Sequence, residues 1–350
     1  MGEPKRMFDS LQAGRALAAL MVVVHHADEI MSDPRYYSDL WHRVFVAGHS
    51  GVAFFFVLSG AVIFYAHRED IGRPAQAIPY FWKRFRRIYP PYWGVLFCLL
   101  ALYLAMPSTN MHDAFRGSTV IQSILLVHVT DNLCILRTSW TLFHEIMFYG
   151  VFGAAILNRR AGFVLGALWT MASVALLIAQ PPSSLAWEYF TPLHLLFAAG
   201  IAVVYVLPRI RRGGVILGVS GAIAFVSLGI YENLTERLSA AHDVFYGVFA
   251  ALALLGAMSA EGSGRITVPG WLRFLSDASY SIYLVHLPVL AIGMHFLFPL
   301  WRQAQGPMAL LFVCNAVIAT AAGALYYLAV EKPLLAALRG PKARLSSVSA

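Results

Sequence analysis

Residues 8–27 read FDSLQAGRALAALMVVVHHA, an apolar stretch that carries one arginine and two histidines. A helix needs about 20 apolar residues to cross a hydrocarbon core about 30 Å thick. Nine more stretches of this kind follow along the chain. The predicted spans are residues 10–30, 46–66, 88–106, 139–157, 163–180, 190–207, 213–231, 242–259, 278–299 and 307–330. The sequence therefore predicts an all-α fold, a polytopic bundle of about ten transmembrane helices.

The composition excludes an ordinary soluble domain. Of the 350 residues, 59% are hydrophobic and 13% are charged, whereas soluble domains contain about 25% charged residues. The first apolar stretch lacks a small-residue cleavage site, so we expect it to remain in the protein rather than act as a removable signal. Cys98, Cys134 and Cys314 are scattered without metal-ligand spacing, so the sequence predicts neither a metal site nor a disulfide framework.

Residues 1–338 are predicted to form one transmembrane domain, and residues 339–350 a short, basic, disordered cytoplasmic tail. Cytoplasmic loops are enriched in Lys and Arg. With the N-terminus in the cytoplasm, 19 of the 26 basic residues fall in inner segments and 6 in outer segments. Both termini are therefore expected in the cytoplasm. Basic inner loops lie beside anionic lipid headgroups, so membrane lipid is the expected partner of these charges and no nucleic-acid partner is predicted.

The most basic part of the chain precedes the third predicted span and reads YFWKRFRRIYPPY from Tyr80 to Tyr92. Arg84 and Arg87 are three residues apart, which places both on one face of a helix. Two guanidinium groups can bind phosphate oxygens in a bidentate manner that a lone lysine cannot match. Two interpretations remain open for this cluster: a phosphate-binding site, or charges that anchor the span to lipid.

Arg15 and His26 are predicted to share one face of the first span. Eleven residues at about 100° each return to within about 20° of the starting direction, with a rise of about 16 Å. His25 points about 80° away from Arg15, so His26 is the better candidate for a common cavity. A neutral imidazole can take a proton from a hydroxyl near neutral pH. His26 is thus either a general base or a hydrogen-bonded histidine at a helix end.

Glu145 lies inside the predicted span at 139–157, at a depth where a carboxylate must pair, accept hydrogen bonds or be protonated. It either orients and charge-balances a catalytic histidine or forms a structural ion pair with Arg15. Near the span at 278–299, Tyr280, Ser281 and His286 could line a polar substrate path. The alternative for these hydroxyls is hydrogen bonding between neighbouring helices.

The order of these motifs resembles the acyltransferase-3 family of integral membrane acyltransferases. The motifs are Asp9, Arg15 and His26; Gly51 and Ser59-Gly60; Arg84-x-x-Arg87 with Pro90; Ser139-Trp140, Glu145 and Phe148-Tyr149; Ser279-Tyr280-Ser281, Tyr283 and His286; and Glu331-x-Pro333. The segments Leu11-Gln12-x-x-Arg15 and Phe143-His144-Glu145 are most similar to the exopolysaccharide O-acetyltransferase subgroup of this family. The resemblance covers nearly the whole chain.

The resemblance implies an O-acetyltransferase that moves an acyl group, usually acetyl from acetyl-CoA, onto a sugar hydroxyl of an exported or cell-surface polysaccharide. It implies that Arg15, Arg84 and Arg87 bind the donor, that His26 is the general base, and that Glu145 orients or balances it. The acceptor would be a polysaccharide or a lipid-linked oligosaccharide, and polysaccharide export machinery is a candidate partner. The expected location is the bacterial inner membrane.

A transporter or flippase is the alternative from another class. There Arg15, His26, Glu145 and His286 would form a proton or substrate path across the membrane. That function predicts internal repeats with paired broken helices, which the sequence does not show, and it leaves the Arg84–Arg87 pair at the membrane edge unexplained. The sequence therefore favours the transferase.

Overall fold

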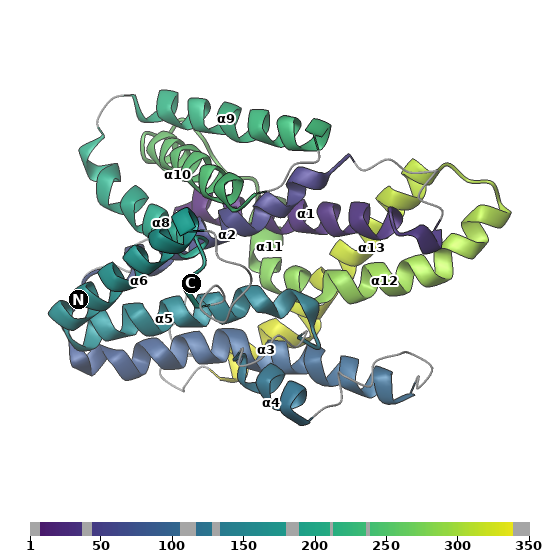
Figure 1. The fold of residues 1–350 in the computed structure, drawn as a ribbon, viewed down its shortest axis with the longest axis horizontal. Helices are drawn as coiled ribbons and strands as arrows, with labels where there is room; N and C mark the ends of the chain where they lie inside the picture. Colours follow the sequence, from purple (N-terminus) through teal and green to yellow (C-terminus); the bar gives the residue numbers. More distant parts are fainter. Residues whose placement is uncertain are drawn as a thin grey trace.

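The structure is a computed structural model that describes residues 8–36, 44–105, 117–127, 134–179, 189–210, 213–235 and 239–338. Within these ranges every regular element is helical (Figure 1). The α-helices are α1 (Asp9–Met31), α2 (Ser50–His67), α3 (Ala77–Ala105), α4 (Gly117–Leu125), α5 (Trp140–Leu157), α6 (Arg159–Ala179), α8 (His194–Val206), α9 (Gly214–Thr235), α10 (Ala240–Gly262), α11 (Gly270–Asp277), α12 (Ser279–Gln303), α13 (Met308–Tyr326) and α14 (Lys332–Ala337). The predicted tail at residues 339–350 lies outside the described residues.

Short helices of other types connect these elements. The 3-10 helices are η1 (Pro34–Tyr36), η3 (Val46–His49), η4 (Pro74–Gln76), η6 (Arg137–Ser139) and η7 (Leu207–Arg209). A π-helix, η8 (Tyr327–Glu331), joins α13 directly to α14. Single π turns inside a longer helix are uncommon and are frequent at functional sites.

Within the described residues, 8 helical segments are long and apolar enough to cross a membrane. They are Val46–His67, Pro74–Ala105, Arg137–Leu157, Arg159–Ala179, Gly214–Thr235, Ala241–Gly262, Ser279–Gln303 and Met308–Ala337. Each overlaps one predicted span, but α3 begins at Ala77 rather than at residue 88, so the basic cluster that was predicted to precede the third span lies within its helix. The chain is therefore a polytopic helical membrane protein.

The other two predicted spans correspond to α1 and α8, which are not among the helices long and apolar enough to cross a membrane. α1 has 23 residues, but Gln12, Arg15 and the two histidines lower its mean hydropathy. α8 has 13 residues and continues only through η7, so it is short for a full crossing. The prediction of ten spans thus exceeds the candidate spans by these two helices.

α1 lies inside the bundle rather than at its surface. It packs against α2, α10, α11 and α12. Figure 1 shows α9 and α10 along one side of the molecule and α3, α4 and α5 along the other. The spans of α6 and α9 are the least buried, at 17% each, so these two helices form the lipid-facing periphery. The polar residues of α1 are therefore shielded from lipid by neighbouring helices.

Glycines set the contact between α2 and α8. A β-carbon on Gly200 would lie 1.9 Å from the carbonyl oxygen of Val57, and one on Gly60 would lie 2.1 Å from that of Phe197. Small residues of this kind allow membrane helices to approach closely. This contact fixes the position of α2, which lines the cavity described below.

Replacing Gly200 with alanine is expected to destabilise the protein by about 3 kcal/mol, because the new methyl group meets backbone that cannot rotate away. Gly150→Ala is the matched control, since a β-carbon there has nothing within 4 Å; it should be neutral or slightly stabilising, because alanine favours a helix by about 1 kcal/mol. Thermal unfolding of the two variants in detergent provides the measurement. Equal unfolding temperatures would contradict the proposed packing.

Candidate active site

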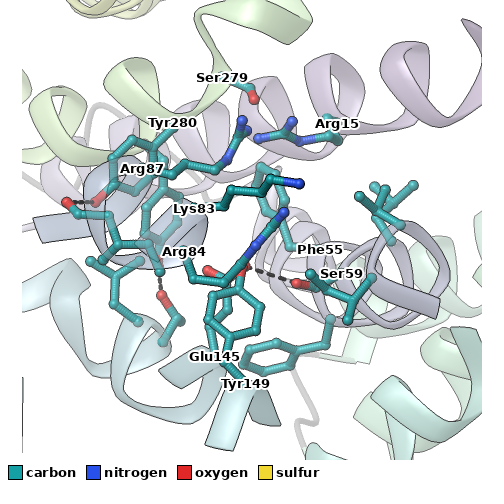
Figure 2. Close-up of a pocket in the computed structure, with 18 of the residues that line it drawn as sticks. Arg15, Phe55, Ser59, Lys83, Arg84, Arg87, Glu145, Tyr149, Ser279 and Tyr280 are labelled. Carbon is teal, nitrogen blue, oxygen red and sulfur yellow. Dashed lines mark hydrogen bonds between the residues drawn. The ribbon is translucent and has the colours of Figure 1, made fainter. Parts of the chain in front are cut away.

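A cavity of about 340 Å³ opens between α1, α2, α3, α5 and α12 (Figure 2). Its charged lining residues are Arg15, Lys83, Arg84, Arg86, Arg87 and Glu145. The cavity brings together residues from sequence positions more than a hundred apart. Of the residues predicted to bind the donor, Arg15, Arg84 and Arg87 all line it.

The two arginines of the Arg-x-x-Arg motif lie on the cavity face of α3, as their spacing predicts. The guanidinium group of Arg84 lies over the rings of Tyr80 and Tyr149, at 5.9 and 5.7 Å from their centroids. These cation–π contacts orient the group. The Nε atom of Arg84 is buried and has no hydrogen-bond partner. Arg84 therefore retains unused hydrogen-bonding capacity inside the cavity.

Arg15 reaches the cavity from α1, opposite α3. In Figure 2 its guanidinium group and that of Arg87 point toward each other, and the two charges interact unfavourably. Within the described part of the chain, neither group has a hydrogen-bond or salt-bridge partner. Converging guanidinium groups with free donors are typical of a site for a phosphate or carboxylate. The cavity is thus suited to an anion with several charges.

Glu145 is the carboxylate that lines this cavity. It accepts hydrogen bonds from the Ser59 hydroxyl at 2.8 Å and from the Tyr149 hydroxyl. The sequence left open whether Glu145 orients a histidine or balances Arg15. In the structure it lies on the arginine side, and its electrostatic effect on Arg15 is favourable.

His26 pairs with His286, on α12, rather than with Glu145. His286 Nε2 lies 3.1 Å from His26 Nδ1. His286 Nδ1 lies 3.1 Å from the carbonyl oxygen of Ile282, and His26 Nδ1 lies 3.0 Å from that of Val22. Because a carbonyl can only accept, both Nδ1 atoms carry the proton. The Nε2 atom of His26 then holds the free lone pair and is the basic atom of the pair.

The residues of the predicted substrate path occupy three different places. Tyr280 lines the cavity and donates to the carbonyl oxygen of Ile88 at 2.7 Å. Ser281 is fully buried and donates to Glu331 at 2.5 Å. His286 belongs to the histidine pair, which does not line the cavity. The three residues therefore do not form one continuous path.

Glu331 is a further functional candidate, to which the sequence alone assigned no role in the site. It is buried at the end of the π-helix η8, which turns it toward α12. Burial disfavours its negative charge, whereas the hydrogen bond from Ser281 and the nearby charges of Arg87 and Arg15 favour it. The only sequence signal was the Glu331-x-Pro333 motif, since a π turn leaves no recognisable pattern. Glu331 and Glu145 together balance part of the positive charge of the cavity.

Comparison with known proteins shows the family of the chain. The sequence model of a family described as an acyltransferase domain matches residues 8–328, which include the cavity-lining helices α1, α2, α3, α5 and α12. The match implies acyltransferase activity for a polytopic membrane protein of this kind. The chain belongs to the acyltransferase-3 family.

A curated relative is the exopolysaccharide production protein ExoZ of Rhizobium meliloti (strain 1021). It is 26% identical over 301 residues, which cover 83% of this chain and 90% of the relative. No solved structure matches the chain. The similarity therefore extends over almost the whole length of both proteins.

Ser281→Ala is expected to destabilise the protein by about 1–3 kcal/mol, because a buried carboxylate loses its hydrogen-bond donor. A double-mutant cycle with Glu331→Gln, followed by thermal unfolding, measures the interaction of the two side chains. We expect a coupling of about 0.5–3 kcal/mol. Additive effects would show that Ser281 does not depend on Glu331 and would favour the predicted substrate path.

Proposed function

We propose that this protein is a membrane-bound O-acyltransferase that transfers an acetyl group from acetyl-CoA to a sugar hydroxyl of an exported or cell-surface polysaccharide. The observation that carries this proposal is the convergence of Arg15, Arg84 and Arg87 at one end of a cavity whose other end lies next to the histidine pair. A transferase needs both features: a place for the anionic part of the donor and a base for the hydroxyl of the acceptor.

The basic end of the cavity matches the phosphates of coenzyme A. The coenzyme carries a pyrophosphate and a 3′-phosphate, and each phosphate group offers oxygens that accept bidentate hydrogen bonds from arginine. Arg84 and Arg87 lie at the N-terminal part of α3, which the distribution of basic residues places on the cytoplasmic side. Acetyl-CoA is a cytoplasmic metabolite, so the donor would enter from this side.

The residues that line the two ends of the cavity indicate how the donor would be oriented in it. Its lining residues on α2 run from Ala66 to Val52, which spans about 21 Å of helix. The basic residues of α3 line one end, whereas Phe55, Thr141 and Tyr283 line the other. Tyr283 is in ring contact with His286, at 5.7 Å between centroids. With its phosphates at the arginines, the donor would extend its thioester toward His26.

The chemistry follows from the tautomer of His26. Its Nε2 takes the proton of the acceptor hydroxyl, and the hydroxyl oxygen attacks the carbonyl carbon of the thioester. The carbon–sulfur bond then breaks, and the thiolate of coenzyme A receives the proton from His26. His286 accepts a hydrogen bond from His26 Nδ1 and stabilises the imidazolium that forms between the two steps. We assign Glu145 to charge balance at the donor end.

The acceptor would approach from the opposite side of the membrane. His26 is half-buried, and it lies about 16 Å along α1 from Arg15. The relative named for exopolysaccharide production supports a polysaccharide or a lipid-linked oligosaccharide as acceptor. This assignment places the protein in a bacterial inner membrane with both termini in the cytoplasm, where polysaccharide export machinery is a candidate partner.

Arg87→Ala is expected to weaken acetyl-CoA binding by about tenfold or more, because a charge-assisted hydrogen bond contributes about 1.5–3 kcal/mol. Isothermal titration of the protein in nanodiscs measures this. Arg209→Ala is the matched control, since Arg209 lies at the end of η7, away from the cavity, and among the described residues it contacts the carbonyl and the ring of Tyr205. Acetyl-pantetheine lacks the phosphates and should bind both variants equally. The same penalty for acetyl-pantetheine would refute the phosphate assignment.

His26→Gln is expected to lower acetyl transfer by about 10²–10⁴-fold, the usual contribution of a general base. Transfer of radiolabel from acetyl-CoA to an extract of surface polysaccharide measures the activity. Donor binding should stay unchanged, because His26 does not line the donor cavity. If wild-type protein neither binds acetyl-CoA nor labels any glycan, the transferase proposal fails.

A further inference from the structure

The donor cavity and the histidine pair are neighbours, but side chains separate them. On α12, Tyr280 and Tyr283 line the cavity, and His286 follows one helical turn later. On α1, Gln12 and Arg15 line the cavity, and His26 lies further along the same helix. The histidine pair therefore lies just beyond one end of the cavity.

Two features close this end of the cavity. The first is the contact between α1 and α2, where a β-carbon on Gly51 would lie 2.6 Å from the carbonyl oxygen of Ala18. The second is a pair of rings: Phe55 and Tyr283 meet edge to face, with centroids 5.8 Å apart, and both line the cavity. The glycine contact involves the backbone of both helices, whereas the ring pair consists of side chains, so the ring pair is the part of the barrier that can move.

Tyr283 is held firmly in this position. Its hydroxyl donates to the carbonyl oxygen of Thr138 at 3.1 Å and lies 2.8 Å from the hydroxyl of Thr141. The side chain is only 6% exposed. The residue lines the cavity, and its ring also contacts that of His286. Tyr283 thus stands between the place of the thioester and the base.

This separation matters because water competes with the acceptor. His26 is half-buried, whereas His286 is fully buried, so water can reach the basic side of the pair through His26. A general base next to a thioester activates water as readily as a sugar hydroxyl. Attack by water would give acetate, free coenzyme A and a proton, and the acyl group would be lost. Excluding water until the acceptor is bound is a recognised function of closed sites.

We propose that Phe55 and Tyr283 form a partition between the donor cavity and the His26–His286 pair, and that this partition selects a glycan hydroxyl over water as the acyl acceptor. The inference rests on the proposed function, because it assumes that the cavity binds acetyl-CoA. It adds that the two rings are specificity-determining residues. Binding of the acceptor, rather than of the donor alone, displaces them.

The test is a gain of hydrolysis in the absence of any glycan. Full-length protein in nanodiscs is mixed with acetyl-CoA, and release of free thiol is followed. Phe55→Ala removes one ring and should raise the rate at least about tenfold over wild type. Phe54→Ala is the matched control, because it makes the same truncation on the same helix but at a ring that contacts Phe225. It should leave the rate unchanged. A misfolded protein would not gain activity.

Two further variants define the mechanism. Tyr283→Phe keeps the ring but removes its hydrogen bonds to Thr138 and Thr141, so it should raise hydrolysis less than Phe55→Ala does; it also serves if Phe55→Ala does not fold. Adding His26→Gln to Phe55→Ala should abolish the gained hydrolysis. Hydrolysis that stays at the wild-type rate in folded, acetyl-CoA-binding Phe55→Ala and Tyr283→Phe proteins would overturn the partition, as would hydrolysis that persists without His26. Failure of wild-type protein to bind acetyl-CoA would instead overturn the proposed function.

Discussion

Enclosing several half-buried cations in one cavity inside the bundle is the constraint on which the arrangement of this protein depends. At an effective dielectric constant of about 20, two like charges about 4 Å apart repel by about 4 kcal/mol. Arg15 and Arg87 face each other across one cavity, with Arg84 and Lys83 nearby. The fold tolerates this because Glu145 and Glu331 supply negative charge from two sides. An anionic ligand would remove the remaining repulsion, so the strain itself favours binding.

The same constraint explains how the helices are distributed. α1 carries Arg15 and two histidines and is packed by α2, α10, α11, α12 and α13. α6 and α9 carry apolar side chains and face outward. Inside the bundle, three hydroxyls donate to acceptors on neighbouring elements: Ser59 to Glu145, Ser281 to Glu331 and Tyr280 to a backbone carbonyl. These hydrogen bonds connect α2 to α5, α12 to the π-helix, and α12 to α3.

Helical periodicity predicted only part of how groups on one helix are placed: Arg15 and His26 on α1 were expected in a common cavity, but only Arg15 lines it. The spacing of Arg84 and Arg87 placed both on one face of α3, and both line the cavity; eight predicted spans also overlap candidate spans. Partners on different helices could not be predicted. Glu145 pairs with Ser59 and Tyr149, and His26 with His286, because the vertical offset between helices decides which groups meet. Glu331 depends on a π turn that sequence patterns do not reveal.

The mean hydropathy of α1 is low because this helix contributes polar residues to the site. A lipid-facing helix with Arg15 and two histidines would be costly, since each charged residue at the bilayer centre costs about 2.5–3.5 kcal/mol on insertion scales. Inside the bundle the same groups face helices that offer carboxylates, carbonyls and a second imidazole. Packing against neighbouring helices therefore keeps α1 in the membrane, although its own mean hydropathy is low. A membrane helix can carry both Arg15 and His26 only when neighbouring helices shield them from lipid. The polar groups that suit α1 to chemistry also make it unfavourable for α1 to face lipid.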